Sequence, residues 1–169
     1  MEKAIAAFRG RLSPEFVLAA GKEELAAIIR PAGFYNQKAA YLQEVTKWYA
    51  SYSCDASAVQ AETLEQLRAG LLQVKGVGRE TADSILLYAF GFPTFVVDAY
   101  THRLCQRYPI DAGKSYEAVK AHFESALPKD VKIYNNFHAL IVINGKEHCR
   151  KKPVCTGCPL AETCERIGL

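Results

Sequence analysis

The stretch LLQVKGVGRETADSILLYAFGFPTFVVDAYTHRL, from Leu71 to Leu104, decides the fold. A short helical pattern leads into a loop with glycines at Gly76 and Gly78, and an apolar helical pattern follows over residues 79–90. Glycine allows the tight reversal of the chain that two consecutive short helices require. We therefore expect a helix–hairpin–helix over about residues 64–90.

Helical patterns dominate the rest of the chain. Ser13 with Pro14 and Thr63 with Gln66 are typical helix starts, the second pair as a capping box. The run TFVV is the only strand-like pattern, and it is too short and too isolated to make a sheet. We therefore predict an all-α fold. Later helices are expected at residues 97–108, 115–127 and 131–144.

Composition and charge limit the class of protein. The 169 residues are 50% hydrophobic and carry a net charge of +3, with a pI near 8.5. This mild basicity is compatible with a nucleic-acid partner without requiring one. No apolar run approaches the length of about 20 residues that crosses a bilayer, and the start MEKAIAAFRGRL lacks the features of a signal peptide. We expect no membrane association and a cytoplasmic, intracellular protein, in which cysteines serve as metal ligands more often than as disulfides.

The glycine loop is a candidate site for a DNA phosphate. Backbone N–H groups of the loop and of the following helix would point outward together, and two basic side chains flank them. A C-cap glycine between two packed helices is the alternative. The residues expected to contact DNA here are Lys75, Gly76, Val77, Gly78 and Arg79.

The C-terminal run CRKKPVCTGCPLAETC concentrates four cysteines in one loop. Four thiolates suit either Zn²⁺ or a [4Fe–4S] cluster, although zinc usually takes paired C-x-x-C motifs and only one such pair is present. The predicted metal ligands are Cys149, Cys155, Cys158 and Cys164. Basic side chains lie in or beside this loop and are expected to contact DNA phosphates: Lys146, Arg150, Lys151 and Lys152.

Three stretches together resemble the endonuclease III-like DNA glycosylases, the helix–hairpin–helix, Gly/Pro-loop and Asp (HhH-GPD) superfamily. They are VKGVGRETADSILLYAFG, VVDAYTHRL and AGFYNQKAAYL. The resemblance covers essentially the whole chain and implies a two-lobe helical fold. The lobes would span residues 1–95, with the hairpin, and 96–169, with the catalytic aspartate and the cluster loop at 149–164. It also implies base excision repair and a partner, double-stranded DNA with a damaged base.

The resemblance assigns roles to two carboxylates. Asp98 falls on the family's catalytic aspartate, which would stabilise the positive sugar or direct a water as the base departs. Capping of the next helix is the alternative role, and one aspartate can do both. Glu80 stands where bifunctional members have the lysine that attacks the sugar, and a carboxylate cannot form that Schiff base. Glu80 therefore implies a monofunctional enzyme without lyase activity, although a surface acid at a helix start is its alternative reading.

Other matched residues refine the expectation. Tyr100 stands where bifunctional members usually have histidine, and with Glu80 it is similar to the branch that removes alkylated purines such as 3-methyladenine. Tyr35 and Tyr100 are weak candidates for the base pocket. The four histidines show no metal-ligand pattern, and His102 lies one helical turn beyond Asp98, from where it could face the carboxylate.

The cysteine loop is similar to the family's C-x6-C-x2-C-x5-C loop around a [4Fe–4S] cluster. Its first gap has five residues where the family has six. The resemblance favours the cluster over zinc, with the role of folding the tail and holding basic residues toward DNA.

Family members also carry some tens of residues before the position that matches Met1. The chain is therefore expected to be N-terminally short, with apolar surface open to self-association or to a partner chain. Two alternatives to an alkylpurine glycosylase stay open: a catalytically silent iron–sulfur DNA-binding module, and a mismatch-specific glycosylase. We expect a cytoplasmic, nucleoid-associated enzyme that hydrolyses N-glycosyl bonds.

Overall fold

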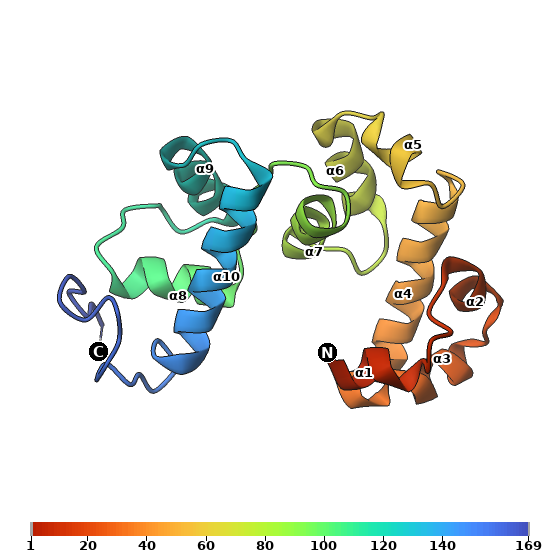
Figure 1. Cartoon of the computed structure of the whole chain (residues 1–169), viewed down its shortest axis with the longest axis horizontal. Helices are drawn as coiled ribbons and strands as arrows, with labels where there is room; N and C mark the ends of the chain where they lie inside the picture. The colour runs from red at the N-terminus through yellow and green to blue at the C-terminus, as the bar shows by residue number, and fades with distance from the viewer. Residues whose placement is uncertain (1, 169) are drawn as a thin grey trace. The chain divides into compact units, whose positions relative to one another are not determined.

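The computed structural model describes residues 2–168 and divides into two compact units, Met1–Gly78 (unit 1) and Arg79–Leu169 (unit 2) (Figure 1). The division falls within the predicted hairpin. The expected boundary after residue 95 lies later in the chain, and as a statement about separate domains it stays a prediction. Over residues 2–168 the regular structure is helical, without a β-strand, so the all-α prediction is confirmed. None of the helices in that range has both the length and the apolar character of a membrane-spanning segment.

Unit 1 begins its helices where the sequence predicts starts. The Ser13 hydroxyl accepts a hydrogen bond from the Phe16 N–H at 3.2 Å, and Thr63 and Gln66 form the predicted capping box. One short helix, α5, was not expected, and the Asp55 side chain caps it. The elements of the unit are α1 (Glu2–Ala7), α2 (Pro14–Ala19), α3 (Lys22–Ile28), the 3-10 helix η1 (Arg30–Ala32), α4 (Tyr35–Ala50), α5 (Ala56–Gln60) and α6 (Leu64–Gln73).

The core of unit 1 is built on α4. The long helix packs against α2 and α3, which lie beside it in Figure 1. A continuous cluster of buried apolar side chains fills this contact. Its members include Phe8, Val17, Leu25, Ile29 and Ala39, and Tyr35 packs at its edge.

Unit 2 differs from the sequence prediction at helix ends. The helix expected over residues 79–90 is α-helical only to Ser84 and then widens into a π-helical turn, η2. The helix expected at residue 97 begins at Ala99, because Asp98 takes the N-cap position. The elements are α7 (Arg79–Ser84), η2 (Ile85–Ala89), α8 (Ala99–Arg107), α9 (Tyr116–Ala126) and α10 (Val131–Glu147).

The core of unit 2 forms between α8, α9 and α10. Helices α8 and α10 pack directly against each other, as Figure 1 shows. The approach is close at Gly145, where an added Cβ would lie only 2.3 Å from Cδ1 of Tyr100. The irregular segment over residues 91–98 crosses this core, with Phe95 fully buried and stacked on Phe123 at 4.6 Å between ring centroids. This segment ends at Asp98, the N-cap residue of α8.

Candidate active site

Asp98 caps helix α8 with one of its two carboxylate oxygens. The Oδ1 atom accepts hydrogen bonds from the backbone N–H of Thr101 at 2.8 Å and from the Thr101 hydroxyl at 2.9 Å. The Asp98 backbone N–H in turn donates to the Thr101 hydroxyl at 3.4 Å, which completes a capping box. The capping role considered from the sequence is therefore real. Because it uses only Oδ1, it leaves Oδ2 for another function.

The second oxygen of Asp98 faces a histidine of α10. His138 Nε2 lies 3.6 Å from Asp98 Oδ2, and the side chains are only 10% and 12% exposed. The other ring nitrogen of His138, Nδ1, makes a short hydrogen bond with the hydroxyl of Tyr88 on η2. His138 thus lies between the carboxylate and a phenol. The sequence pointed instead to His102 as the histidine that could face Asp98.

A fixed carboxylate charge results from these contacts. Burial alone would raise the pKa of Asp98, but the interactions with His138 and with the N–H and hydroxyl of Thr101 outweigh burial. The net result is a pKa below the ordinary value of 3.8. Asp98 is therefore a largely buried anion at neutral pH, which suits stabilisation of positive charge.

Glu80, in the first turn of α7, lies within electrostatic range of Asp98. Partial burial raises the pKa of Glu80 above 4.5, the Asp98 charge raises it further, and His138 and His102 lower it to a smaller extent. The structure thus brings together the two carboxylates that the sequence selected. No lysine contributes to the pKa shift of either carboxyl group.

A buried ionic network holds the segment that leads to Asp98. Lys120 Nζ lies 3.7 Å from Asp83 Oδ1 and 2.6 Å from Glu124 Oε1. Glu124 Oε1 also accepts a hydrogen bond from the Phe95 N–H at 2.8 Å. The Tyr116 hydroxyl donates to Asp83 Oδ2 at 2.7 Å. This network joins α7 and α9 to the irregular segment and was not foreseen from the sequence.

The hairpin loop contains two glycines with different surroundings. Gly76 has φ of +89°, and an added Cβ would lie 2.1 Å from the Tyr41 ring, so only glycine fits there. An added Cβ at Gly78 would meet no heavy atom within 4 Å. Lys75 is exposed, whereas the guanidinium of Arg79 lies 3.4 Å from a carboxylate oxygen of Glu117. A phosphate at this loop would compete with that ion pair.

The two tyrosines considered for a base pocket pack in different units. Tyr35 starts α4 in unit 1 and touches the apolar cluster there. Tyr100 lies against Gly145, with the guanidinium carbon of Arg103 at 5.4 Å from its ring centroid. Their role in base binding stays a prediction. Phe34, for which no role was expected from the sequence, is 85% exposed and has the left-handed φ of +47°.

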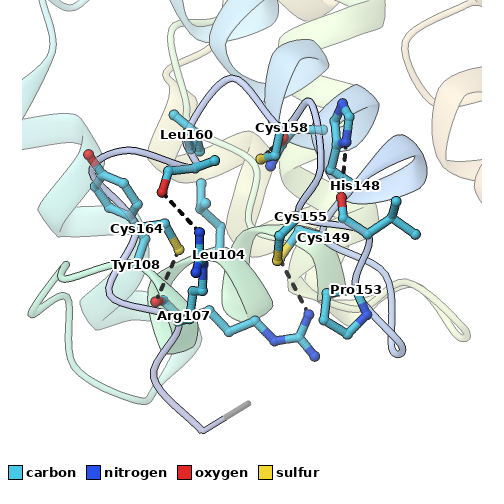
Figure 2. Close-up of a pocket in the computed structure, with 14 residues that line it drawn as sticks. Leu104, Arg107, Tyr108, His148, Cys149, Pro153, Cys155, Cys158, Leu160 and Cys164 are labelled. Atoms are coloured by element: carbon cyan, nitrogen blue, oxygen red, sulfur yellow. Dashed lines mark hydrogen bonds between the residues drawn. The ribbon is translucent and has the colours of Figure 1, made fainter.

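The four cysteines predicted as metal ligands line one pocket of unit 2 (Figure 2). The cavity has a volume of about 30 Å³, and Leu104, Arg107 and Tyr108 of α8 contribute to its wall. The Cys149 sulfur accepts a hydrogen bond from Arg107 Nη1 at 3.5 Å. Within residues 2–168 no three such side chains converge closely enough to hold a metal ion as they stand. A metal centre would have to draw the thiols together.

Two arginines of α8 fix the start of the cysteine loop. Arg103 donates to the carbonyl oxygen of Cys149 at 2.9 Å, and Arg107 donates to the carbonyl oxygens of Arg150 at 2.6 Å and Lys151 at 3.2 Å. The helix that Asp98 caps is therefore tied directly to the basic part of the loop. The side chains predicted to contact DNA are exposed there: Lys146, Arg150, Lys151 and Lys152.

Comparison with known proteins places this arrangement in a family. Residues 1–129, which include Glu80 and Asp98, match the model of the HhH-GPD superfamily of base excision DNA repair proteins. A protein of Methanocaldococcus jannaschii that carries the provisional name DNA repair glycosylase is 47% identical over 152 residues, covering 88% of this chain and 69% of that protein.

Two solved structures are similar over most of the chain. One is a trapped covalent intermediate of endonuclease III with DNA, at 26% identity and a TM-score of 0.76, covering 98% of this chain and 74% of the other. The second is the Helicobacter pylori 3-methyladenine DNA glycosylase bound to 1,N6-ethenoadenine, at 25% identity and a TM-score of 0.75, covering 86% and 76%. The resemblance noted in the sequence is confirmed, and the chain belongs to the HhH-GPD superfamily of base excision DNA repair proteins.

Proposed function

We propose that the protein is a monofunctional DNA glycosylase that removes an alkylated purine from double-stranded DNA. The observation that carries the proposal is the pair of Asp98 and Glu80. Asp98 is held as a carboxylate with one oxygen outside the helix cap, and Glu80 stands where a lyase needs an amine. The likeness to both endonuclease III and a 3-methyladenine glycosylase supports the reaction class and the substrate class.

The main requirement that this reaction places on the protein is a negative charge held near the sugar. The bond between C1′ and the base nitrogen breaks, and its electron pair leaves with the base. The positive charge on the sugar is stabilised by the Asp98 carboxylate, and a water then adds to C1′ and releases its proton to solvent. An alkylated purine is already cationic, so departure of the base needs no strong general acid. Strand cleavage requires an amine nucleophile, which a carboxylate at position 80 does not supply.

DNA would be held through its backbone. The Val77 N–H already donates to the Val74 carbonyl oxygen at 3.0 Å, so the backbone N–H proposed to meet a phosphate is that of Gly78, where open space allows its approach. The exposed side chains of the cysteine loop add positive charge. Phe34 is a candidate wedge, because an exposed aromatic ring in a strained backbone suits insertion between bases.

Cys149, Cys155, Cys158 and Cys164 are proposed to hold a [4Fe–4S] cluster. The donor set fits this group, since four soft sulfur ligands line one pocket and Arg107 donates toward one of them. When bound, the cluster would stabilise the fold of the loop rather than supply redox chemistry to base removal. Iron and acid-labile sulfide content of the purified protein, measured against zinc, tests the assignment. Zinc without iron would overturn it.

The function is tested by base release from duplexes that each carry one alkylated, oxidised or mismatched base. Strand breaks are measured before and after hot alkali, with borohydride present in a parallel reaction. We expect breaks on alkylated purines only after alkali, and no protein–DNA adduct. Release of a mismatched base instead would reassign the substrate, and a trapped adduct would contradict the monofunctional reading. Binding without release from any duplex would favour the catalytically silent module.

A further inference from the structure

The middle of α10 contains a buried polar group that the fold alone does not explain. His138 lies on the buried side of the helix with Tyr134, Ile141 and Gly145, and it is 8% exposed. Its Nε2 atom has no hydrogen-bond partner within residues 2–168, although it is completely screened from solvent. Burial of a polar nitrogen without a partner is costly, so such a group is usually kept for a purpose. Here the nitrogen is aimed at Asp98 Oδ2, 3.6 Å away.

The hydrogen-bonding pattern fixes where the proton of His138 belongs. A carboxylate oxygen only accepts, so Nε2 must carry the proton in order to interact with Asp98. In the neutral ring Nδ1 is then an acceptor, and the Tyr88 hydroxyl must be the donor to it. The result is a directed chain from the Tyr88 O–H to Nδ1 and from the Nε2–H to Asp98 Oδ2. An approach closer by about 0.5 Å turns the last contact into an ordinary hydrogen bond.

We propose that His138, oriented by Tyr88, is a positioning residue that holds the Asp98 carboxylate in the orientation used for base release. The proposal rests on the catalytic role given to Asp98 above. Thr101 holds Oδ1 by two hydrogen bonds, and His138 Nε2 faces Oδ2 at 3.6 Å, so the two neighbours together restrict rotation of the carboxylate plane. Placed groups of this kind are effective because the orientation is set before the reaction begins.

The charges around Asp98 come from every element packed near it. Glu80 on α7 is a second acid, Tyr88 on η2 is a phenol, His102 lies on α8, and His138 lies on α10. Asp98 also raises the pKa of Tyr88, after burial, which is the larger cause. A deprotonated Tyr88 is thereby disfavoured, so its hydroxyl stays available as a donor to His138. With Glu80 nearby as a like charge, His138 acts together with the N–H and hydroxyl of Thr101 to keep Asp98 ionised.

The first test needs no DNA. The carboxyl carbon of Asp98 is titrated by NMR in the wild type and in His138→Leu, His138→Gln and Tyr88→Phe. His138→Leu should raise the apparent pKa of Asp98 by about one unit, and His138→Gln, which keeps an N–H near the position of Nε2, should restore most of it. Tyr88→Phe should give a smaller rise, and because Tyr88 is 46% exposed this variant should fold even if His138→Leu does not. His122→Leu, a histidine of α9 that has no contact with Asp98 in the described chain, is the matched control.

The second test is the pH dependence of single-turnover base release. In His138→Leu the acid limb should move to higher pH by the same amount as the Asp98 titration, with unchanged DNA affinity, and His138→Gln should move it back. An Asp98 titration that is unchanged in both His138→Leu and Tyr88→Phe would overturn the proposal. A rate reduced equally at every pH would also overturn it, because a purely structural role predicts that result. Lack of base release by the wild type would instead defeat the proposed function, and the Asp98 titration would still decide whether His138 controls the carboxylate.

Discussion

Two aspartates of unit 2 contrast a carboxylate that serves the fold with one that we propose serves the reaction. Asp83 is fully buried, and its two oxygens receive the Thr94 hydroxyl at 3.1 Å, the Tyr116 hydroxyl at 2.7 Å and the Lys120 ammonium at 3.7 Å. Within the described residues Asp98 has no lysine or arginine partner: Thr101 hydrogen-bonds to one oxygen, and His138 lies 3.6 Å from the other. A carboxylate paired with a permanent cation stabilises the packing of helices. A carboxylate without such a partner can stabilise a positive charge that forms only during the reaction.

The largest effect is expected from Asp98→Asn. Asparagine caps helices about as well as aspartate, so the Oδ1 contacts with Thr101 persist while the charge is lost. Base release should fall by about 10³-fold, within the range for loss of a positioned acid–base or charged group. Single-turnover rates of base release from the duplex on which the wild type is fastest, with DNA affinity measured in parallel, check this. Turnover within a few-fold of the wild type would remove Asp98 from the mechanism.

Lys120→Met should damage the fold instead. Removal of the ammonium leaves the fully buried Asp83 and the part-exposed Glu124 without their cation, and loss of one partner of a buried ion pair typically costs about 3–5 kcal/mol of unfolding free energy. Urea unfolding of the whole protein measures the loss of stability. The double variant with Asp83→Asn should recover part of it, because one uncompensated charge is removed. At a temperature where Lys120→Met is still folded, its rate of base release should exceed that of Asp98→Asn.

Thr101→Val tests which of the two carboxylate oxygens of Asp98 is needed for base release. Thr101 is fully buried and valine has nearly its shape, so the change removes the hydroxyl while the Thr101 N–H still reaches Oδ1. We expect about 1 kcal/mol of lost stability and a base-release rate within about tenfold of the wild type. A rate as low as that of Asp98→Asn would mean that the capped oxygen, and not Oδ2, is the one that matters.

The sequence predicted most of the fold and selected Asp98 and Glu80, but not the side chains that surround them. Local signals were sufficient for the caps at Ser13, Thr63 and Asp98, because each bonds within three residues of itself. His138 was missed because it meets Asp98 across 40 positions of sequence. The signal available was a histidine on an otherwise apolar helical stripe, at the spacing of Tyr134, His138 and Ile141. A polar ring on a buried face needs a hydrogen-bonding or charged partner. Which residue is that partner can be seen only from how α10 packs in the structure.

Helix ends in unit 2 differed from expectation for a related reason. The π-helical turn at η2 has more residues per turn than an α-helix, so it shifts the direction of the side chains after Ser84, and Tyr88 lies against His138. The residue types over 85–89 do not distinguish a π-helical turn from an α-helix, since Ile, Leu and Ala are ordinary helix residues. The buried network of Lys120 was hidden in the same way, because its members come from α7, α9 and the segment between them.

The smallest effect expected is on Glu80, and it tests how close the two candidate carboxylates lie. Partial burial and the Asp98 charge hold the pKa of Glu80 above 4.5. Asp98→Asn removes that charge, so the pKa of Glu80 should fall, which NMR titration of its carboxyl carbon measures. Asp83→Asn is the matched control, since Asp83 does not contribute to the shift. A Glu80 titration that responds equally to both changes would mean that the effect is a general loss of structure.

The same shifts give opposite pH dependences of stability. The stability that Glu80 contributes is complete at low pH and is lost as the pH rises past 4.5 and through the raised pKa of the folded state. Asp98 contributes stability that is complete above 3.8 and is lost as the pH falls through its lowered pKa. Glu80→Gln should therefore remove the decline above pH 4.5 and leave the acid limb in place, because Glu80 is already protonated there. An acid limb that moves with Glu80→Gln would show that the two carboxyl groups share a proton as a coupled pair, and Asp98 would then not be the isolated anion that base release requires.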